Sequence, residues 1–176
     1  GRRVVRLLAA DPSVKGVRAL DRAVVPGNDP RVERHQIDVA AGALAGLLEG
    51  CDSVVHPAED PGRRSDAALA VSVLDRVMGA AEESGCGHLV LLSSALVYGA
   101  QADNPVPLTE SHARRADRLL AYAGAKARLE EAAEERVAGS GLSLAVLRPT
   151  TTLSERGVSY IAGALRAWQV FTSVSA

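Results

Sequence analysis

The sequence predicts an α/β fold with a mostly parallel, doubly wound sheet and helices on both of its faces. Two observations carry this prediction. Short apolar runs alternate with longer segments of helical periodicity along the chain. The run at 88–93 is nearly continuous in Leu and Val, as expected of a strand covered on both faces. In such a sheet the crossovers are right-handed, and the ligand crevice lies outside the carboxyl ends of the strands.

The individual elements follow from periodicity and from stop signals. Gly50 and Gly85 each follow a helical segment, and glycine readily takes the left-handed cap. The stretch 98–112 is expected to be irregular, and 157–170 weakly helical. In chain order we expect a helix over 1–10 ended by Asp11-Pro12, strands over 17–20 and 33–37, a helix over 41–48, a strand over 53–56, a helix over 65–84, a strand over 88–93, a helix over 114–138 and a strand over 143–147.

Length and charge limit the classes of function. With 176 residues, 47% of them hydrophobic, and a net charge of −1, the chain is expected to form one domain spanning 1–176. Basic and acidic residues are interspersed, which argues against nucleic-acid and anionic-membrane partners. No apolar run is long enough for a membrane span and no signal-peptide pattern opens the sequence, so cytoplasmic residence is expected. Cys51 and Cys86 lack metal-ligand spacing, so neither a metal site nor a disulfide is expected.

Tyr122 and Lys126 form the sharpest pair of candidate catalytic residues. Four residues apart on a helix, they share one face and lie close enough to interact. A nearby cation favours the phenolate and lowers the pKa of a tyrosine from about 10 toward the working range. Three tyrosines and two lysines would give about 0.03 such pairs by chance. The alternative is a chance pair on an amphipathic surface helix, with the charged side chain in solvent.

Ser94 is the second candidate, at the carboxyl end of the apolar strand 88–93. A hydroxyl at that end of a parallel sheet faces the ligand crevice and can donate a hydrogen bond to a substrate oxygen. The alternative is a strand-to-loop turn in which the serine only satisfies nearby backbone groups.

Together these residues resemble a known family. The matching segments are Ser93-Ser94-Ala95-Leu96-Val97-Tyr98-Gly99, the Tyr122–Lys126 pair, Leu147-Arg148-Pro149-Thr150, and Val54-Val55-His56-Pro57-Ala58. Their order resembles that of the extended short-chain dehydrogenase/reductases, the NAD-dependent epimerase/dehydratase family, over nearly the whole chain. The resemblance implies a Rossmann-type domain.

The resemblance also implies a reaction and roles. The expected function is NAD-dependent oxidoreduction, epimerisation or dehydration at a hydroxyl or keto carbon, with a nucleotide sugar as the expected substrate. Tyr122 would be the acid/base, Lys126 would lower its pKa and bind the nicotinamide ribose, and Ser94 would hold the substrate oxygen, with Ser93 the weaker choice. Alternatives are a non-catalytic or cofactor-sensing member of the fold and a steroid- or flavanol-type reductase.

NAD is the cofactor that the resemblance implies. Asp21 would accept hydrogen bonds from the adenosine ribose, a contact that a 2′-phosphate would oppose. Arg22 beside it could instead cradle that phosphate, so NADP stays open. The expected cofactor-binding residues are Gly1, Asp21, Arg22, Asp38, Val39, Pro57, Ala58, Tyr122, Lys126, Pro149 and Thr150.

The sequence departs from the family pattern at several places. The family's first strand and its glycine-rich GxxGxxG turn are not found; Gly1 matches the last glycine of that turn, and the substrate-binding segments after the Arg-Pro strand are short. Without the first strand, we expect two buried strand edges to remain unpaired. Ala70 stands where the family usually has Asn, and Pro57 and Glu59 replace apolar or small residues.

The resemblance further implies a homodimer. The helices near 65–84 and 114–138 would form its interface.

Overall fold

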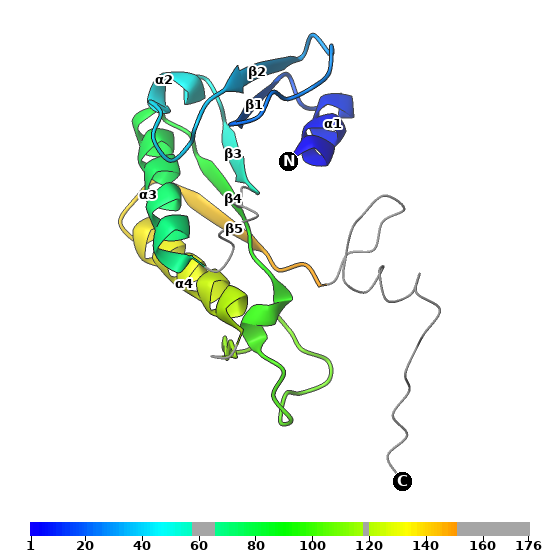
Figure 1. The fold of residues 1–176 in the computed structure, drawn as a ribbon, viewed down its shortest axis with the longest axis vertical. Helices are drawn as coiled ribbons and strands as arrows, with labels where there is room; N and C mark the ends of the chain where they lie inside the picture. Colours follow the sequence, from blue (N-terminus) through cyan, green and yellow to red (C-terminus); the bar gives the residue numbers. More distant parts are fainter. Residues whose placement is uncertain (58–65, 118–119, 151–176) are drawn as a thin grey trace.

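The computed structural model describes residues 1–57, 66–117 and 120–150. Its order of elements is that of an α/β fold (Figure 1). The segment 157–170, which was predicted to be weakly helical, lies outside the described residues. The elements are α1 (Arg2–Ala10), β1 (Val17–Asp21), β2 (Val32–Gln36), α2 (Ala45–Leu48), β3 (Ser53–His56), α3 (Ala67–Glu83), β4 (His88–Leu92), the 3-10 helix η1 (Ala95–Tyr98), α4 (Ala121–Val137) and β5 (Ser143–Leu147).

The strands form two parallel sheets. One has the order β1-β2, with Val17 opposite Val32, and the other has the order β3-β4-β5. In Figure 1, α1 lies on one side of the strands and α2, α3 and α4 lie on the other. The predicted parallel α/β arrangement is confirmed.

Within the described ranges, β1 pairs only with β2, and β3 pairs only with β4. One edge of β1 and one edge of β3 are therefore without a partner strand.

The main core lies between the three-stranded sheet and the helices α3 and α4. Leu74 and Met78 of α3 and Leu89 and Leu91 of β4 are all fully buried. Asp66 is the N-cap of helix α3, and its side chain accepts a hydrogen bond from the Leu69 N–H at 3.0 Å. This core holds β4 and α4 together, and these elements carry the candidate catalytic residues.

Gly85 ends α3 as predicted. It has a φ of +72°, in the left-handed region that glycine occupies at little cost.

The predicted helix over 41–48 was wrong at its start, because α2 spans only Ala45–Leu48. The Asp38 carboxylate accepts a hydrogen bond from the Ala40 N–H, and the Asp38 carbonyl accepts from the Ala41 and Gly42 N–H groups. This local turn competes with the helix for the same donors.

The predicted helix over 114–138 was also too long, since α4 begins at Ala121. Arg115 instead donates its backbone N–H to the Val97 carbonyl at 2.9 Å. Tertiary contacts thus hold the segment before α4 in a non-helical path.

The predicted alternation of strand and helix fails between β1 and β2. No helix lies between them in this described part of the chain, yet they pair in parallel.

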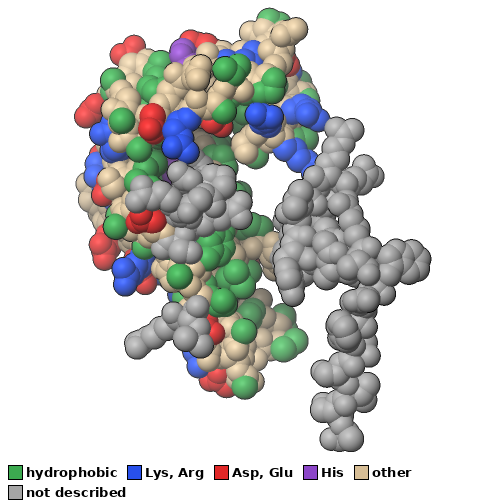
Figure 2. Space-filling model, viewed as in Figure 1, with side chains coloured by type: hydrophobic (Ala, Val, Ile, Leu, Met, Phe, Trp, Pro, Cys, Tyr) green, Lys and Arg blue, Asp and Glu red, His purple; other side chains and the backbone are tan. Residues whose placement is uncertain are grey.

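Figure 2 shows acidic and basic side chains interspersed over much of one face of the molecule.

Candidate active site

The predicted site residues gather where the parallel strands end. Asp21 ends β1, Pro57 follows β3, Ser94 comes two residues after β4, and Pro149 comes two residues after β5. Because the strands within each sheet are parallel, the ends of β3, β4 and β5 share one edge of their sheet, and ligands bind at such edges in folds of this kind. Of the remaining predicted positions, Ala58 lies outside the described residues.

Lys126 connects α4 to the end of β4. It is only 5% exposed, and its ammonium group donates a hydrogen bond to the Leu92 carbonyl at 2.8 Å. The Lys126 Nζ also lies 5.8 Å from the centre of the Tyr122 ring, within cation–π range. The predicted contact between Tyr122 and Lys126 is therefore present, and Lys126 does not extend into solvent.

Ser94 is buried and is the N-cap of η1. Its hydroxyl oxygen accepts a hydrogen bond from the Leu96 N–H at 3.2 Å, so the serine does satisfy a nearby backbone group. That bond uses an oxygen lone pair and not the hydroxyl proton. Ser94 therefore keeps a proton that it can donate to a bound molecule.

His56 is a further titratable residue at this edge. It ends β3 and is 7% exposed. Burial and then the charge of Lys126 lower the pKa of His56 from 6.5 to about 4. The imidazole is thus neutral at pH 7. The sequence indicated it only as part of a family segment, although a polar residue closing an apolar strand is a signal that could have singled it out.

The two candidate adenosine-binding carboxylates are oriented by their own turns. An Asp21 oxygen accepts from the Ala23 N–H at 2.9 Å, and an Asp38 oxygen accepts from the Ala40 N–H at 2.9 Å. The Arg22 carbonyl accepts a hydrogen bond from Gln36 at 3.1 Å. Both carboxylates therefore stay near the ends of β1 and β2.

Two further residues predicted to bind the cofactor, Val39 and Pro149, accept hydrogen bonds through their backbone carbonyl groups. The Val39 carbonyl accepts from Arg76 at 3.3 Å, and the Pro149 carbonyl accepts from the Ala95 N–H at 3.0 Å. Gly1 is the N-cap of α1, and Thr150 is the last described residue before 151–176.

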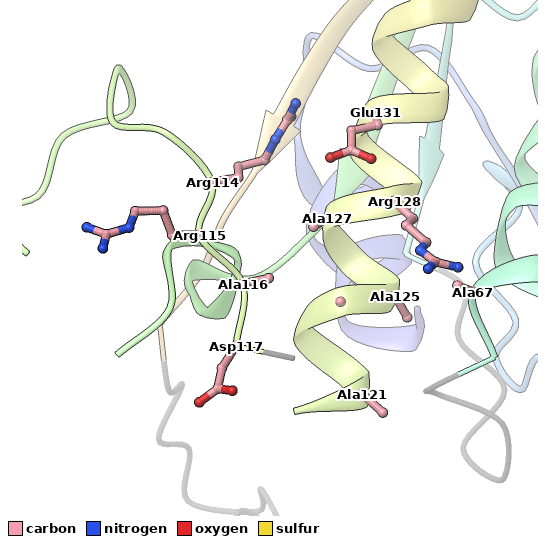
Figure 3. Close-up of a pocket in the computed structure, with 11 residues that line it drawn as sticks. Ala67, Arg114, Arg115, Ala116, Asp117, Ala121, Ala125, Ala127, Arg128 and Glu131 are labelled. Carbon is pink, nitrogen blue, oxygen red and sulfur yellow. The ribbon is translucent and has the colours of Figure 1, made fainter. Parts of the chain in front are cut away.

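A groove of about 700 Å³ lies beside this centre but does not contain it. Figure 3 shows it between α4 and the segment that precedes α4, with Arg115 pointing away from the helix. Arg115 forms an ion pair with Asp103 at 2.9 Å. The groove is lined by Ala67, Arg114, Arg115, Ala116, Asp117, Ala121, Gly124, Ala125, Ala127, Arg128 and Glu131, and so by none of the three candidate catalytic residues.

The residues at the strand ends suit a dinucleotide. The Asp21 carboxylate matches the hydrogen-bonding needs of a ribose diol, the Asp38 carboxylate can accept from an adenine amino group, and the buried ammonium of Lys126 matches a second ribose. The chemistry of this donor set therefore fits a nicotinamide dinucleotide.

Sequence reasoning missed one group at this edge. Glu130 and Arg148 are hydrogen-bonded to each other, and Arg148 also contacts the Tyr98 hydroxyl at 2.7 Å. The spacing in the sequence could have indicated Glu130, because Tyr122, Lys126 and Glu130 follow one another at intervals of four residues and therefore share one helix face.

Parallel sheets, helices on two sides and polar residues at the strand ends define a doubly wound dinucleotide-binding class. The family model described as NAD(P)H-binding matches residues 1–170. The chain belongs to this NAD(P)H-binding family, which confirms the predicted family and cofactor class.

Solved structures support the same assignment. MoeE5 in complex with UDP-glucuronic acid and NAD has a TM-score of 0.76 and 27% identity, over 95% of this chain and 57% of that chain. DesIV, a dTDP-glucose 4,6-dehydratase from Streptomyces venezuelae crystallised with NAD, has a TM-score of 0.69 and 27% identity, over 84% and 51% of the two chains.

A third structure supports the fold alone. UDP-glucuronic acid 4-epimerase from Bacillus cereus in complex with NAD has a TM-score of 0.70 and 19% identity, over 86% and 53% of the two chains. The chain thus spans about half the length of the solved structures that it matches.

The search of curated proteins found no match. Among the described residues, no helix is both long and apolar enough to cross a membrane.

Proposed function

We propose that residues 1–176 form one cofactor-binding domain of an NAD-dependent epimerase, dehydratase or related oxidoreductase that acts on a nucleotide sugar in the cytoplasm. Ser94, Tyr122 and Lys126 are its catalytic centre. The observation that carries the proposal is the Lys126–Leu92 hydrogen bond of 2.8 Å, because it anchors the helix bearing Tyr122 to the strand end that leads into Ser94.

The roles of the three residues follow from their environments. The ammonium of Lys126 favours the phenolate of Tyr122, which then accepts the proton of a substrate hydroxyl. Ser94 donates its hydroxyl proton to the same substrate oxygen and holds it in place. The bound nicotinamide supplies the hydride acceptor or donor.

The cofactor is proposed to be NAD, bound with its adenosine ribose at Asp21. That carboxylate is fixed by the Ala23 N–H and would repel a 2′-phosphate. Arg22 is the neighbouring residue that would favour NADP, so the relative affinity for the two cofactors tests this assignment. Gly1, Asp38, Val39, Pro57, Ala58, Pro149 and Thr150 complete the proposed cofactor site.

The substrate class rests on the likeness to MoeE5 and DesIV. The former is in complex with UDP-glucuronic acid and the latter is a dTDP-glucose 4,6-dehydratase. Both likenesses have 27% identity, so a nucleotide sugar is the first substrate to test.

The test uses the purified protein with NAD and a panel of UDP- and dTDP-sugars, with product analysis by chromatography. Tyr122→Phe is expected to abolish turnover while leaving the Kd for NAD nearly unchanged, since the phenyl ring remains. Unchanged turnover in Tyr122→Phe would remove that residue from its role.

Lys126→Met provides a second test with a matched control. The substitution removes the ammonium at the centre and is expected to lower turnover and weaken NAD binding. Lys15→Met removes the other lysine, which is exposed and lies between α1 and β1, and is expected to change neither quantity. Equal effects of the two substitutions would contradict the proposal.

A non-catalytic, cofactor-sensing protein of the same fold is the second candidate. The observation in its favour is Ala70, which packs partly buried against the main core on α3 where the family usually has Asn. NAD binding without turnover of any sugar in the panel would favour this candidate. Turnover of a steroid or flavanol alone would instead favour the reductase alternative.

We further propose a homodimer through α3 and α4. Small residues, including Ala68 and Ser72 of α3 and Gly124 of α4, line two grooves of about 430 and 700 Å³ on these helices. Such residues allow the helices of a second copy to approach closely. Gel filtration that finds only a monomer would contradict this proposal.

A further inference from the structure

Glu130 is a buried carboxylate that the proposed chemistry does not use. It is 0% exposed and lies one turn of α4 beyond Lys126. Burial raises the pKa of Glu130, but Arg148, the nearby Ser93 hydroxyl and Arg114 together outweigh this effect, so the pKa lies below its ordinary value. A charged group buried this completely needs partners in a defined geometry.

Arg148 provides most of that geometry. Its Nη2 donates to a Glu130 oxygen at 2.7 Å, and its Nε lies 3.1 Å from both carboxylate oxygens. Its Nη1 donates to the Tyr98 hydroxyl at 2.7 Å and to the Glu110 carbonyl at 3.3 Å. The guanidinium also lies 5.2 Å from the centre of the Tyr98 ring. Arg148 thus joins the end of β5 to α4, to η1 and to the segment before α4.

Arg114 connects the same segment to α4 a second time. It donates to Glu130 at 3.0 Å and to both oxygens of Glu134 at 2.6 and 2.8 Å. The buried Ser93 hydroxyl lies near enough to the Glu130 carboxylate to lower its pKa, yet it has no hydrogen bond of good geometry among the described residues. The connection therefore depends on the two arginines.

These contacts connect the elements that carry the proposed catalytic centre. The end of β4 remains joined to β5 through the Ser93 N–H, which donates to the Leu147 carbonyl at 2.8 Å. Ser94 is thereby connected to the β5 end that carries Arg148, and Tyr122 and Lys126 lie on the helix that carries Glu130. The Glu130–Arg148 contact is thus a second connection between these two parts of the centre, beside the Lys126–Leu92 hydrogen bond.

A network of buried charges is a poor source of stability, since apolar residues of the same volume often stabilise as well or better. Its distinctive contribution is a directional, bidentate geometry that holds parts in register. We propose that Glu130, acting through Arg148 and Arg114, is a positioning residue that sets the placement of Ser94 relative to Tyr122 and Lys126. This inference rests on the proposed function.

The test keeps every charge and changes only geometry. Glu130→Asp withdraws the carboxylate from the arginines by about one methylene, and Arg148→Lys removes the bidentate fork. Glu135→Asp is the matched control, because it makes the same change on the same helix at an exposed carboxylate outside the contacts of Arg148 and Arg114. Both network variants are expected to lower kcat about 100-fold, as a small misplacement of reacting groups does, while KM and the Kd for NAD change by less than about threefold. The control is expected to keep its kcat.

Retained kcat in Glu130→Asp and Arg148→Lys, with only the melting temperature lowered, would overturn the proposal and leave a purely structural role. If one of these two variants fails to fold, the other is measured together with Tyr98→Phe. This substitution removes only the hydroxyl that Arg148 contacts, and the same loss of kcat is expected from it.

A second readout separates this inference from the proposed function. If the unmodified protein turns over no sugar, the proposed function fails, but the positioning role of Glu130 can still be tested. The ionisation of Tyr122 is then measured from the absorbance of its phenolate, with Tyr122→Phe as the baseline. Displacement of Lys126 in the network variants is expected to move that ionisation to higher pH, with no change in Glu135→Asp. Identical titrations in all four proteins would overturn the positioning role.

Discussion

The neutral, buried state of His56 makes stability depend on pH in a defined window. Burial and the neighbouring Lys126 lower its pKa in the folded protein from 6.5 to about 4. In the unfolded chain the imidazole takes up a proton as soon as the pH falls below about 6.5. The unfolded state therefore binds more protons, and stability falls as the pH falls from about 6.5 to about 4, below which both states are protonated.

The magnitude follows from these two values. Relative to a chain without this histidine, the free energy of unfolding is expected to decrease by about 2 kcal/mol between about pH 7 and about pH 5. For a chain of this size, that corresponds to a melting temperature about 4–8 °C lower.

Urea unfolding of the unmodified protein and of His56→Asn at both pH values measures this quantity. The other titratable groups are shared by the two proteins, so their effects cancel in the difference between the two pH responses. The unmodified protein is expected to lose about 2 kcal/mol more than the variant over this interval. Equal losses in the two proteins would refute the reasoning.

Two further predictions concern the elements that hold the site. Gly99→Ala is expected to lower the free energy of unfolding by roughly 3 kcal/mol or more, because Gly99 has a φ of +70° and an added Cβ would meet the Arg115 carbonyl oxygen. Gly85 has a similar φ of +72°, but an added Cβ there would lie in open space. Gly85→Ala is therefore expected to lower the free energy of unfolding by about 1–2 kcal/mol. Equal costs in urea unfolding would contradict this steric argument. Leu74→Ala, in a fully buried side chain, is expected to cost about 2–5 kcal/mol, whereas Leu7→Ala, 63% exposed, is expected to change stability by about 0.5 kcal/mol or less. A small effect at Leu74, measured in the same way, would show that the main core repacks around the missing side chain.

The order of elements and the Tyr122–Lys126 contact could be predicted from the sequence. Apolar runs of strand length and the four-residue spacing on one helix are local patterns, and local patterns survive folding. The ends of the helices were predicted less well. At 41–44 the turn made by Asp38 replaced the first residues of the expected helix, and at 114–117 contacts with Val97 and Glu130 did the same.

What the sequence by itself determined is a parallel α/β fold of the NAD(P)H-binding family, with its candidate catalytic residues at the strand ends. Only the tertiary structure decided that Lys126 is buried against the Leu92 carbonyl, that His56 is neutral beside it, and that Glu130 joins Arg148 and Arg114. These contacts connect residues 16 or more positions apart. Periodicity reports which face a side chain occupies, whereas the packing of separate elements decides which charged groups meet there and how far they are removed from water.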